Sequence, residues 1–313
     1  MPLPRAKRTP DVANRGIPPY TPCMAQIDFD LARYIAHRKG RVLQRARDGA
    51  AYGFSREIRH RRNLIALRPV AFAIDATSRQ WKGSAKDSLV TASTRATDTS
   101  YARLYATAQL ATRLLGLERC PPIYVSDVQG PVGAWALGTD DDSVVVVHPV
   151  WLDALSDSEL LAVVGRTLGY VQNNLVPYTT ALYYLEHDAF FFVRWVVTPA
   201  ILALRAWTKR ADISCDRAGL ICTRDAGITS AALLRSLGAY SGPLDYEGLA
   251  KSAEAPPGPL AELLGQQKQL RRRIEALHVF SKTYLYSQLI GDDDPSGMAT
   301  DKADELVAEI LDN

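Results

Sequence analysis

The segment that decides the fold is Leu160-Leu161-Ala162-Val163-Val164-Gly165-Arg166-Thr167-Leu168-Gly169-Tyr170-Val171-Gln172-Asn173. Ser156 precedes it, and Glu159 follows that serine by three residues, which is the spacing of a capping box at a helix N-terminus. Pro177 interrupts the pattern at the other end, because proline has no backbone N–H to continue a helix. The sequence therefore predicts a helix from Ser156 to Val176.

Three residues of this helix have the spacing of the His-Glu-x-x-His motif of zinc peptidases: Arg166, Thr167 and Tyr170. In that motif two histidines one turn apart bind zinc, and the glutamate activates the zinc-bound water. Arginine is a permanent cation without a lone pair to donate, threonine is no general base at neutral pH, and neutral tyrosine is a poor ligand. We therefore expect no catalytic residues, no zinc and no other cofactor at these positions.

Four further segments accompany the helix. They are Gly133-Ala134-Trp135-Ala136-Leu137-Gly138, the apolar run from Ser143 to His148, Asp212-Ile213-Ser214-Cys215-Asp216-Arg217-Ala218-Gly219-Leu220, and Arg272-Arg273-Ile274-Glu275-Ala276-Leu277. Together with the helix they resemble the M48 family of zinc metallopeptidases, which includes the HtpX-like proteases and the CAAX prenyl endopeptidases. The resemblance covers roughly residues 100 to 290, and the chain resembles a degenerate member without the zinc motif.

The resemblance implies an α+β fold that is predominantly helical, with a zincin-like core and a small β-sheet. It places Asp212 at the third zinc ligand and Asp216 at the aspartate that supports the ligands. Without the metal these vestigial carboxylates would be close like charges, which is costly, and a guanidinium fork suits them. We hypothesise that Arg166 pairs with Asp212, Asp216 or both in place of zinc. The alternative is that Arg166 points into solvent without a partner.

Composition indicates an ordinary folded protein, with 313 residues, 47% of them hydrophobic, and a net charge of +3. Residues 1–62 carry fourteen lysines and arginines against five acids, so the start of the chain is strongly basic. We expect a basic N-terminal arm and helix over 1–62, a peptidase-fold domain over 63–291 and a helical tail over 292–313. Four cysteines without a Cys-x-x-Cys pair, and a proline-rich start without an apolar leader, favour a cytoplasmic location.

Local patterns predict the remaining elements. Helices are expected at 29–47, 101–115, 209–223, 229–237, 258–280 and 300–311, and short strands at 123–126, 134–137 and 144–147. The apolar stretch 181–207 is interrupted by charges, and its longest uncharged part is too short to cross a bilayer. We expect a docked helix pair bent near Pro199. A membrane-dipping hairpin with peripheral membrane contact, and a partner-binding surface, are the alternatives.

Three functions remain open on the sequence. The leading interpretation is an inactive pseudopeptidase that binds a protein partner and serves as a scaffold or assembly module. The second is an active zinc metallopeptidase with relocated ligands, such as His148 or His187 with Asp212. The third is a basic adaptor for an anionic membrane or nucleic acid, although no nucleic-acid motif accompanies the basic arm.

Overall fold

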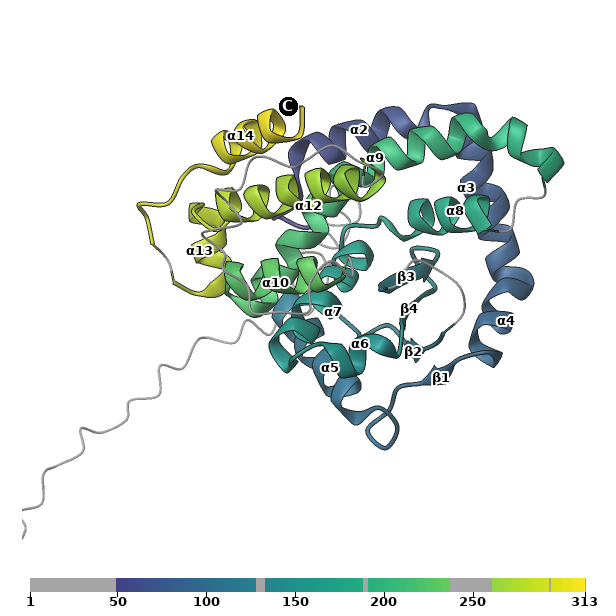
Figure 1. The fold of residues 1–313 in the computed structure, drawn as a ribbon, viewed down its shortest axis with the longest axis horizontal. Coiled ribbons are helices and arrows are strands. Elements are labelled where there is room, and N and C mark those ends of the chain that lie inside the picture. The colour runs from purple at the N-terminus through teal and green to yellow at the C-terminus, as the bar shows by residue number, and fades with distance from the viewer. Residues whose placement is uncertain (1–48, 128–132, 188–190, 237–260, 293, 313) are drawn as a thin grey trace, which may run out of the picture. The chain divides into compact units, whose positions relative to one another are not determined.

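The structure, a computed structural model, describes residues 49–127, 133–187, 191–236, 261–292 and 294–312. Helices make up most of these residues, and one four-stranded sheet accompanies them (Figure 1). The α+β class with a predominance of helices is therefore confirmed. The helix predicted over 29–47 lies outside the described residues.

The sheet has the strand order β1-β2-β4-β3, in which β2 and β4 are parallel and the other pairs antiparallel. Three of its strands were predicted from the sequence, each to within one residue at either end. β4 is the central strand of this group, and β3 lies at the edge of the sheet. The strands are β1 (Thr94–Arg95), β2 (Ile123–Val125), β3 (Ala134–Gly138) and β4 (Ser143–Val147).

Helices cover both faces of this sheet. Val145 and Val147 of β4 pack into the cluster that contains α5 and α7 side chains, whereas Val144 and Val146 pack with Trp81 on the opposite face. Side chains alternate between the faces of a strand, so β4 is buried on both sides and reads as a continuous valine run.

The described helices follow one another along the chain as labelled in Figure 1. Those predicted at 101–115, 229–237, 258–280 and 300–311 are present within three residues of the expected ends. The helices are α2 (Ser55–Ile65), α3 (Arg68–Gln80), η1 (Trp81–Ala85), α4 (Lys86–Thr91), α5 (Ala102–Leu115), α6 (Val150–Ala154), α7 (Asp157–Gln172), α8 (Val176–His187), α9 (Phe191–Thr223), α10 (Ala226–Ser236), α12 (Ala261–Phe280), α13 (Tyr284–Ile290) and α14 (Thr300–Asp312).

Helix α7 begins as predicted and ends earlier. The Ser156 side chain accepts from the Glu159 backbone, and the Glu159 carboxylate accepts from the Ser156 backbone, which completes the capping box. The predicted end at Val176 is wrong, because α7 stops at Gln172 and Asn174 adopts a left-handed conformation with φ of 56°. Pro177 instead lies in the first turn of α8, where its missing N–H costs no helical bond.

The stretch predicted as a helix pair forms α8 and the 33-residue α9, which continues through Pro199. The predicted helix at 209–223 is therefore the second half of a longer one. Ala200, Leu204 and Trp207 of α9 are buried in one cluster with Tyr178 of α8. Among the described residues, no helix combines the length and the apolar character needed to cross a bilayer.

The predicted domain boundaries stay predictions. The described residues, from 49 to 312, belong to one compact unit, and α2 runs across the boundary expected after residue 62. Asp304 of α14 accepts from the Ser55 backbone and from Arg217, which is fully buried between Phe54 and Phe280. The Asp304 carboxylate therefore joins α14 to α9 through Arg217 and to α2 through the Ser55 backbone.

Helices α7 and α9 make the most extensive contact in the fold, and small residues let them approach closely. A Cβ atom added at Gly169 would lie 2.8 Å from the Ala218 Cβ atom and 3.1 Å from the Cys215 Cα atom. Neither atom belongs to a flexible side chain, so the two helix axes would have to separate to admit a methyl group.

We predict that Gly169→Ala lowers the free energy of unfolding by about 1–3 kcal/mol through overpacking. Gly83→Ala is the matched control, because a Cβ there meets nothing within 4 Å; its stability should change by less than about 1 kcal/mol. Urea unfolding measures both. Equal stability of the two variants would contradict the close approach of α7 and α9.

Candidate functional site

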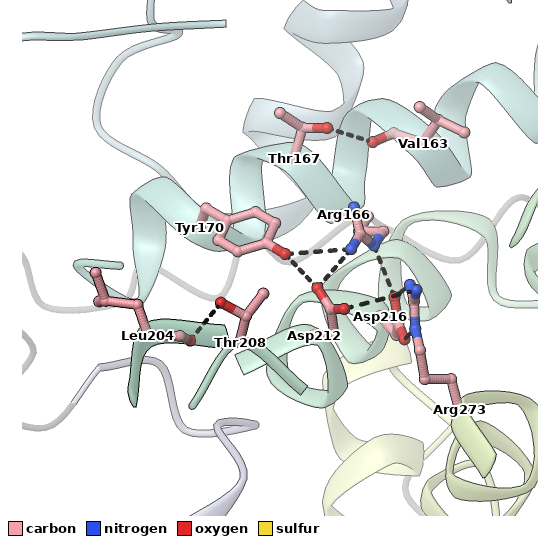
Figure 2. Close-up of polar contacts among 9 residues, drawn as sticks. All are labelled: Val163, Arg166, Thr167, Tyr170, Leu204, Thr208, Asp212, Asp216 and Arg273. Atoms are coloured by element: carbon pink, nitrogen blue, oxygen red, sulfur yellow. Dashed lines mark hydrogen bonds and ion pairs between the residues drawn. The ribbon is translucent and has the colours of Figure 1, made fainter. Parts of the chain in front are cut away.

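Two pairs of side chains face each other across the contact between α7 and α9. Arg166 and Tyr170 lie one turn apart on α7, and Asp212 and Asp216 lie one turn apart on α9. Because the two helices pack tightly, all four polar groups meet in one cluster (Figure 2).

Arg166 bonds to both carboxylates of α9. Its Nε atom donates to Asp216 at 2.8 Å, and its Nη2 atom donates to Asp212 at 2.7 Å. The Arg166 side chain keeps 21% of its surface exposed, and its third nitrogen, Nη1, makes none of these bonds. The structure therefore brings together the three residues of the predicted pairing.

Tyr170 is the second α7 residue of the cluster. Its hydroxyl donates to Asp212 and accepts from Arg166 Nη2 at 3.2 Å. A phenol at this position supplies a proton donor to the carboxylate rather than a lone pair to a metal. Burial raises the pKa of Tyr170 well above its usual value, so the hydroxyl remains protonated and able to donate.

Arg273 of α12 is a member of the cluster that the sequence did not single out as a site residue. Its Nε and Nη2 atoms donate to the two oxygens of Asp216, both at 2.7 Å, and its Nη1 atom lies 3.6 Å from Asp212. Leu270 and Leu277, three residues before and four after, are buried on the same side of α12. An arginine on an apolar helix face was the signal available in the sequence.

The cluster balances two positive against two negative charges that are largely, but not completely, shielded from water. Asp216 is 1% exposed, so its carboxylate depends on the two guanidinium groups for its hydrogen bonds. Burial alone would raise the pKa of Asp212, but Arg273, Arg166 and the Tyr170 hydroxyl lower it below its usual value. Burial would lower the pKa of Arg166, but Tyr170 and the two carboxylates raise it. These shifts favour the charged forms of Asp212 and Arg166.

Thr167 lies apart from this cluster. Its side chain is fully buried and donates to the Val163 carbonyl at 2.8 Å, directed away from the arginine and the carboxylates (Figure 2). At the position that the resemblance gives to the catalytic glutamate, the chain thus holds a hydroxyl that is bonded within its own helix.

A cavity of about 340 Å³ opens beside the charged cluster. Its polar lining includes the cluster residues Arg166, Tyr170, Asp212, Asp216 and Arg273 together with Glu186, and most of its remaining wall is apolar. The apolar wall comes from β3, α6, α7, α8 and α10, and includes Trp135, Trp151, Val163, Leu182, Tyr183 and Leu233. Its shape and chemistry suit a ligand that has an apolar group next to a hydrogen-bonding group.

The edge strand β3 forms one side of the cavity. Its outer edge is covered in part by α8, because the Ala136 carbonyl accepts from Thr179 at 3.3 Å and the Gly138 N–H donates to Thr180 at 2.8 Å. Backbone directions alternate along an antiparallel strand, so Ala134 presents its backbone to the same outer edge. Ala134 also lines the cavity, so the beginning of β3 lies beside the cavity.

The residues at this cluster do not fit a catalytic zinc ion. Arg166 has no lone pair to give, and both oxygens of Asp212 already face donors or cations. Over the part of the chain that the structure describes, no three His, Cys, Asp or Glu side chains gather in a way that could hold a metal. His148 Nδ1 accepts from the Val150 backbone at 3.3 Å, and the side chain of His187 lies outside the described part.

We predict that Arg273→Met lowers the free energy of unfolding by about 3 kcal/mol, because Asp216 would lose its bidentate partner while buried. Arg271→Met is the control on the same helix, since Arg271 is 42% exposed and pairs with Glu275; it should cost less than about 1 kcal/mol. Denaturant unfolding of both variants checks this. A loss of the same size in both would mean that the buried cluster does not stabilise the fold.

We predict a pH-dependent contribution from Asp212. Its pKa is lowered in the folded state, so its stabilisation is complete above the unfolded value of about 3.9 and is lost as the pH falls through the folded value. The stability difference between wild type and Asp212→Asn should therefore shrink below about pH 4. The exposed Asp98→Asn serves as control. A difference that stays constant from neutral to acid pH would contradict the prediction.

Comparison with known proteins finds a partial similarity by sequence to a curated protein. The chain is 27% identical over 133 residues to plastoglobule-localized metallopeptidase 48, chloroplastic, from Arabidopsis thaliana, an alignment that covers 41% of this chain and 38% of that protein. The alignment thus spans less than half of the relative. No family model and no solved structure matches the chain. The similarity supports a distant relationship to the M48 metallopeptidases.

Proposed function

We propose that this protein is a catalytically inactive relative of the M48 peptidases that binds an extended peptide segment of a protein partner. The observation that carries the proposal is that the Arg166 guanidinium hydrogen-bonds to both Asp212 and Asp216. In this proposal the guanidinium occupies the place of the metal, and the cavity beside it is kept as a binding site.

Charge compensation supports the replacement of a metal by arginine. Two aspartates so close together and so little exposed require two positive charges, which a dication would supply in one atom. Here Arg166 and Arg273 supply the same charge from α7 and α12. The guanidinium fork also matches carboxylate geometry: Arg273 binds both oxygens of Asp216, and Arg166 and Tyr170 donate to Oδ1 of Asp212 without a metal.

The same residues argue against hydrolysis at this cluster. A general base must have a pKa near the working pH and a free lone pair in reach of a water molecule. Asp212 has a lowered pKa and is engaged by Tyr170 and Arg166, and Thr167 is bonded within its own helix. No residue of this cluster is therefore placed to activate a water.

The cavity supports the peptide-binding part of the proposal. A peptide beside Ala134 would extend the sheet by backbone hydrogen bonds, and one of its apolar side chains would enter between Trp135 and Leu182. Nη1 of Arg166 would then be available to a peptide carbonyl. Strand addition recognises backbone, so the partner is defined by its extended conformation and by one apolar residue.

Metal content and proteolysis test the proposal. Full-length protein purified without chelator should contain near-zero zinc by elemental mass spectrometry, and it should cleave no unstructured peptide with zinc added. The fourfold variant Arg166→His, Thr167→Glu, Tyr170→His and Asp212→Glu is the positive control and should gain zinc. Stoichiometric zinc or zinc-dependent cleavage in the unaltered protein would contradict the proposal.

Peptide binding is measured on the same preparation with a mixed library of short unstructured peptides. Trp135→Ala with Leu182→Ala should weaken binding by at least about tenfold, because two apolar walls are lost. Tyr284→Ala is the control, since this tyrosine is 40% exposed and does not line the cavity. Equal binding by both variants would exclude the cavity as the binding site.

A further inference from the structure

The turn between α2 and α3 carries an unusual group of exposed apolar side chains. Ile65 is 49%, Leu67 is 47% and Phe72 is 66% exposed. Their neighbours Leu64 and Val70 occupy the buried positions of the same helices, so the core is complete without the three exposed residues. Figure 1 shows this turn at the upper edge of the view, where α2 leads into α3. We refer to residues 59–72 as the apolar corner.

Exposed arginines accompany the apolar corner along the chain. Arg59 and Arg68 are both exposed. Between residues 55 and 74 the sequence has a single acid, Glu57, which is 1% exposed and lies inside the fold with Arg61. The next acid along the chain, Asp75, already pairs with Arg79 at 2.7 Å. The chain at the corner therefore carries exposed apolar groups beside exposed arginines.

Helix geometry places an apolar and a basic residue of this corner together. Arg68 and Phe72 are four residues apart on α3, so they share one face, while Val70 and Ala73 turn into the core. Leu67 is the N-cap residue of α3, in the turn between α2 and α3. A turn with apolar side chains at its tip and arginines around it can insert the former among acyl chains and set the latter against phosphates.

We propose that the apolar corner docks on the surface of an anionic lipid bilayer. Charge complementarity favours this occupant, because arginines at a bilayer surface gain from anionic headgroups while the exposed apolar side chains leave water. Nucleic acid would leave Ile65 and Leu67 in water, since it offers no apolar surface to aliphatic side chains. The proposal is independent of the peptide-binding function, and it places the contact at residues 59–72, outside the stretch 181–207.

Co-sedimentation of the full-length protein with vesicles tests the proposal. One vesicle is phosphatidylcholine alone, and the other contains phosphatidylglycerol as roughly a third of its lipid. We expect binding to the anionic vesicle, weakened by salt, and a loss of at least about tenfold in the double variant Leu67→Ser, Phe72→Ser. Arg59→Gln with Arg68→Gln should reduce the salt dependence. Both variants change exposed residues, so folding should be unaffected, as circular dichroism verifies.

Val150→Ser is the matched control, since Val150 is a 55% exposed apolar residue on α6, and its binding should equal that of the unaltered protein. Other basic segments of the chain can attract anionic vesicles by charge alone. The decisive comparison is therefore with the variant Leu67→Ser, Phe72→Ser. If this variant binds anionic vesicles as well as the unaltered protein does, the proposal is overturned. It is also overturned if the unaltered protein binds neither vesicle, or if the corner instead retains a soluble protein partner that the double variant loses.

Discussion

The fold has to supply positive charge and hydrogen-bond donors to two carboxylates in the contact between α7 and α9. Asp212 and Asp216 lie one turn apart on a helix that packs closely against another, and Asp216 is almost completely removed from water. Such a pair is tolerated only if positive charge and hydrogen-bond donors reach it. Arg166 reaches it from α7 and Arg273 from α12, so one cluster fixes how three helices lie together.

Elements controlled by neighbouring residues could be predicted from the sequence. The capping box at Ser156 and Glu159 sets the start of α7, and the valine run of β4 indicates a buried strand. The end of α7 could not be predicted in the same way. It depends on the left-handed conformation of Asn174, which a pattern of apolar residues does not reveal, whereas Pro177 suggested an end some residues too late.

Part of the candidate site could be predicted from the sequence, and part could not. The positions of Arg166, Asp212 and Asp216 followed from the spacing of two helices in a resembled family, and the structure brings these residues within hydrogen-bond distance. Arg273 belongs to a third helix, and the sequence gives no measure of how α12 approaches the other two. The cavity likewise depends on side chains from several separate segments, such as Trp135 and Leu233, so only the folded chain could reveal it.

The positive charges of the cluster have one more consequence, because they are covalent parts of the chain. A bound ion can be removed by a chelator, exchanged for a competitor or missing when a cell is short of it. A guanidinium group is present as soon as the polypeptide is made and cannot diffuse away. Under the proposed function, the contact between α7, α9 and α12 would therefore form without a loading step and would not depend on the supply of metals around the protein.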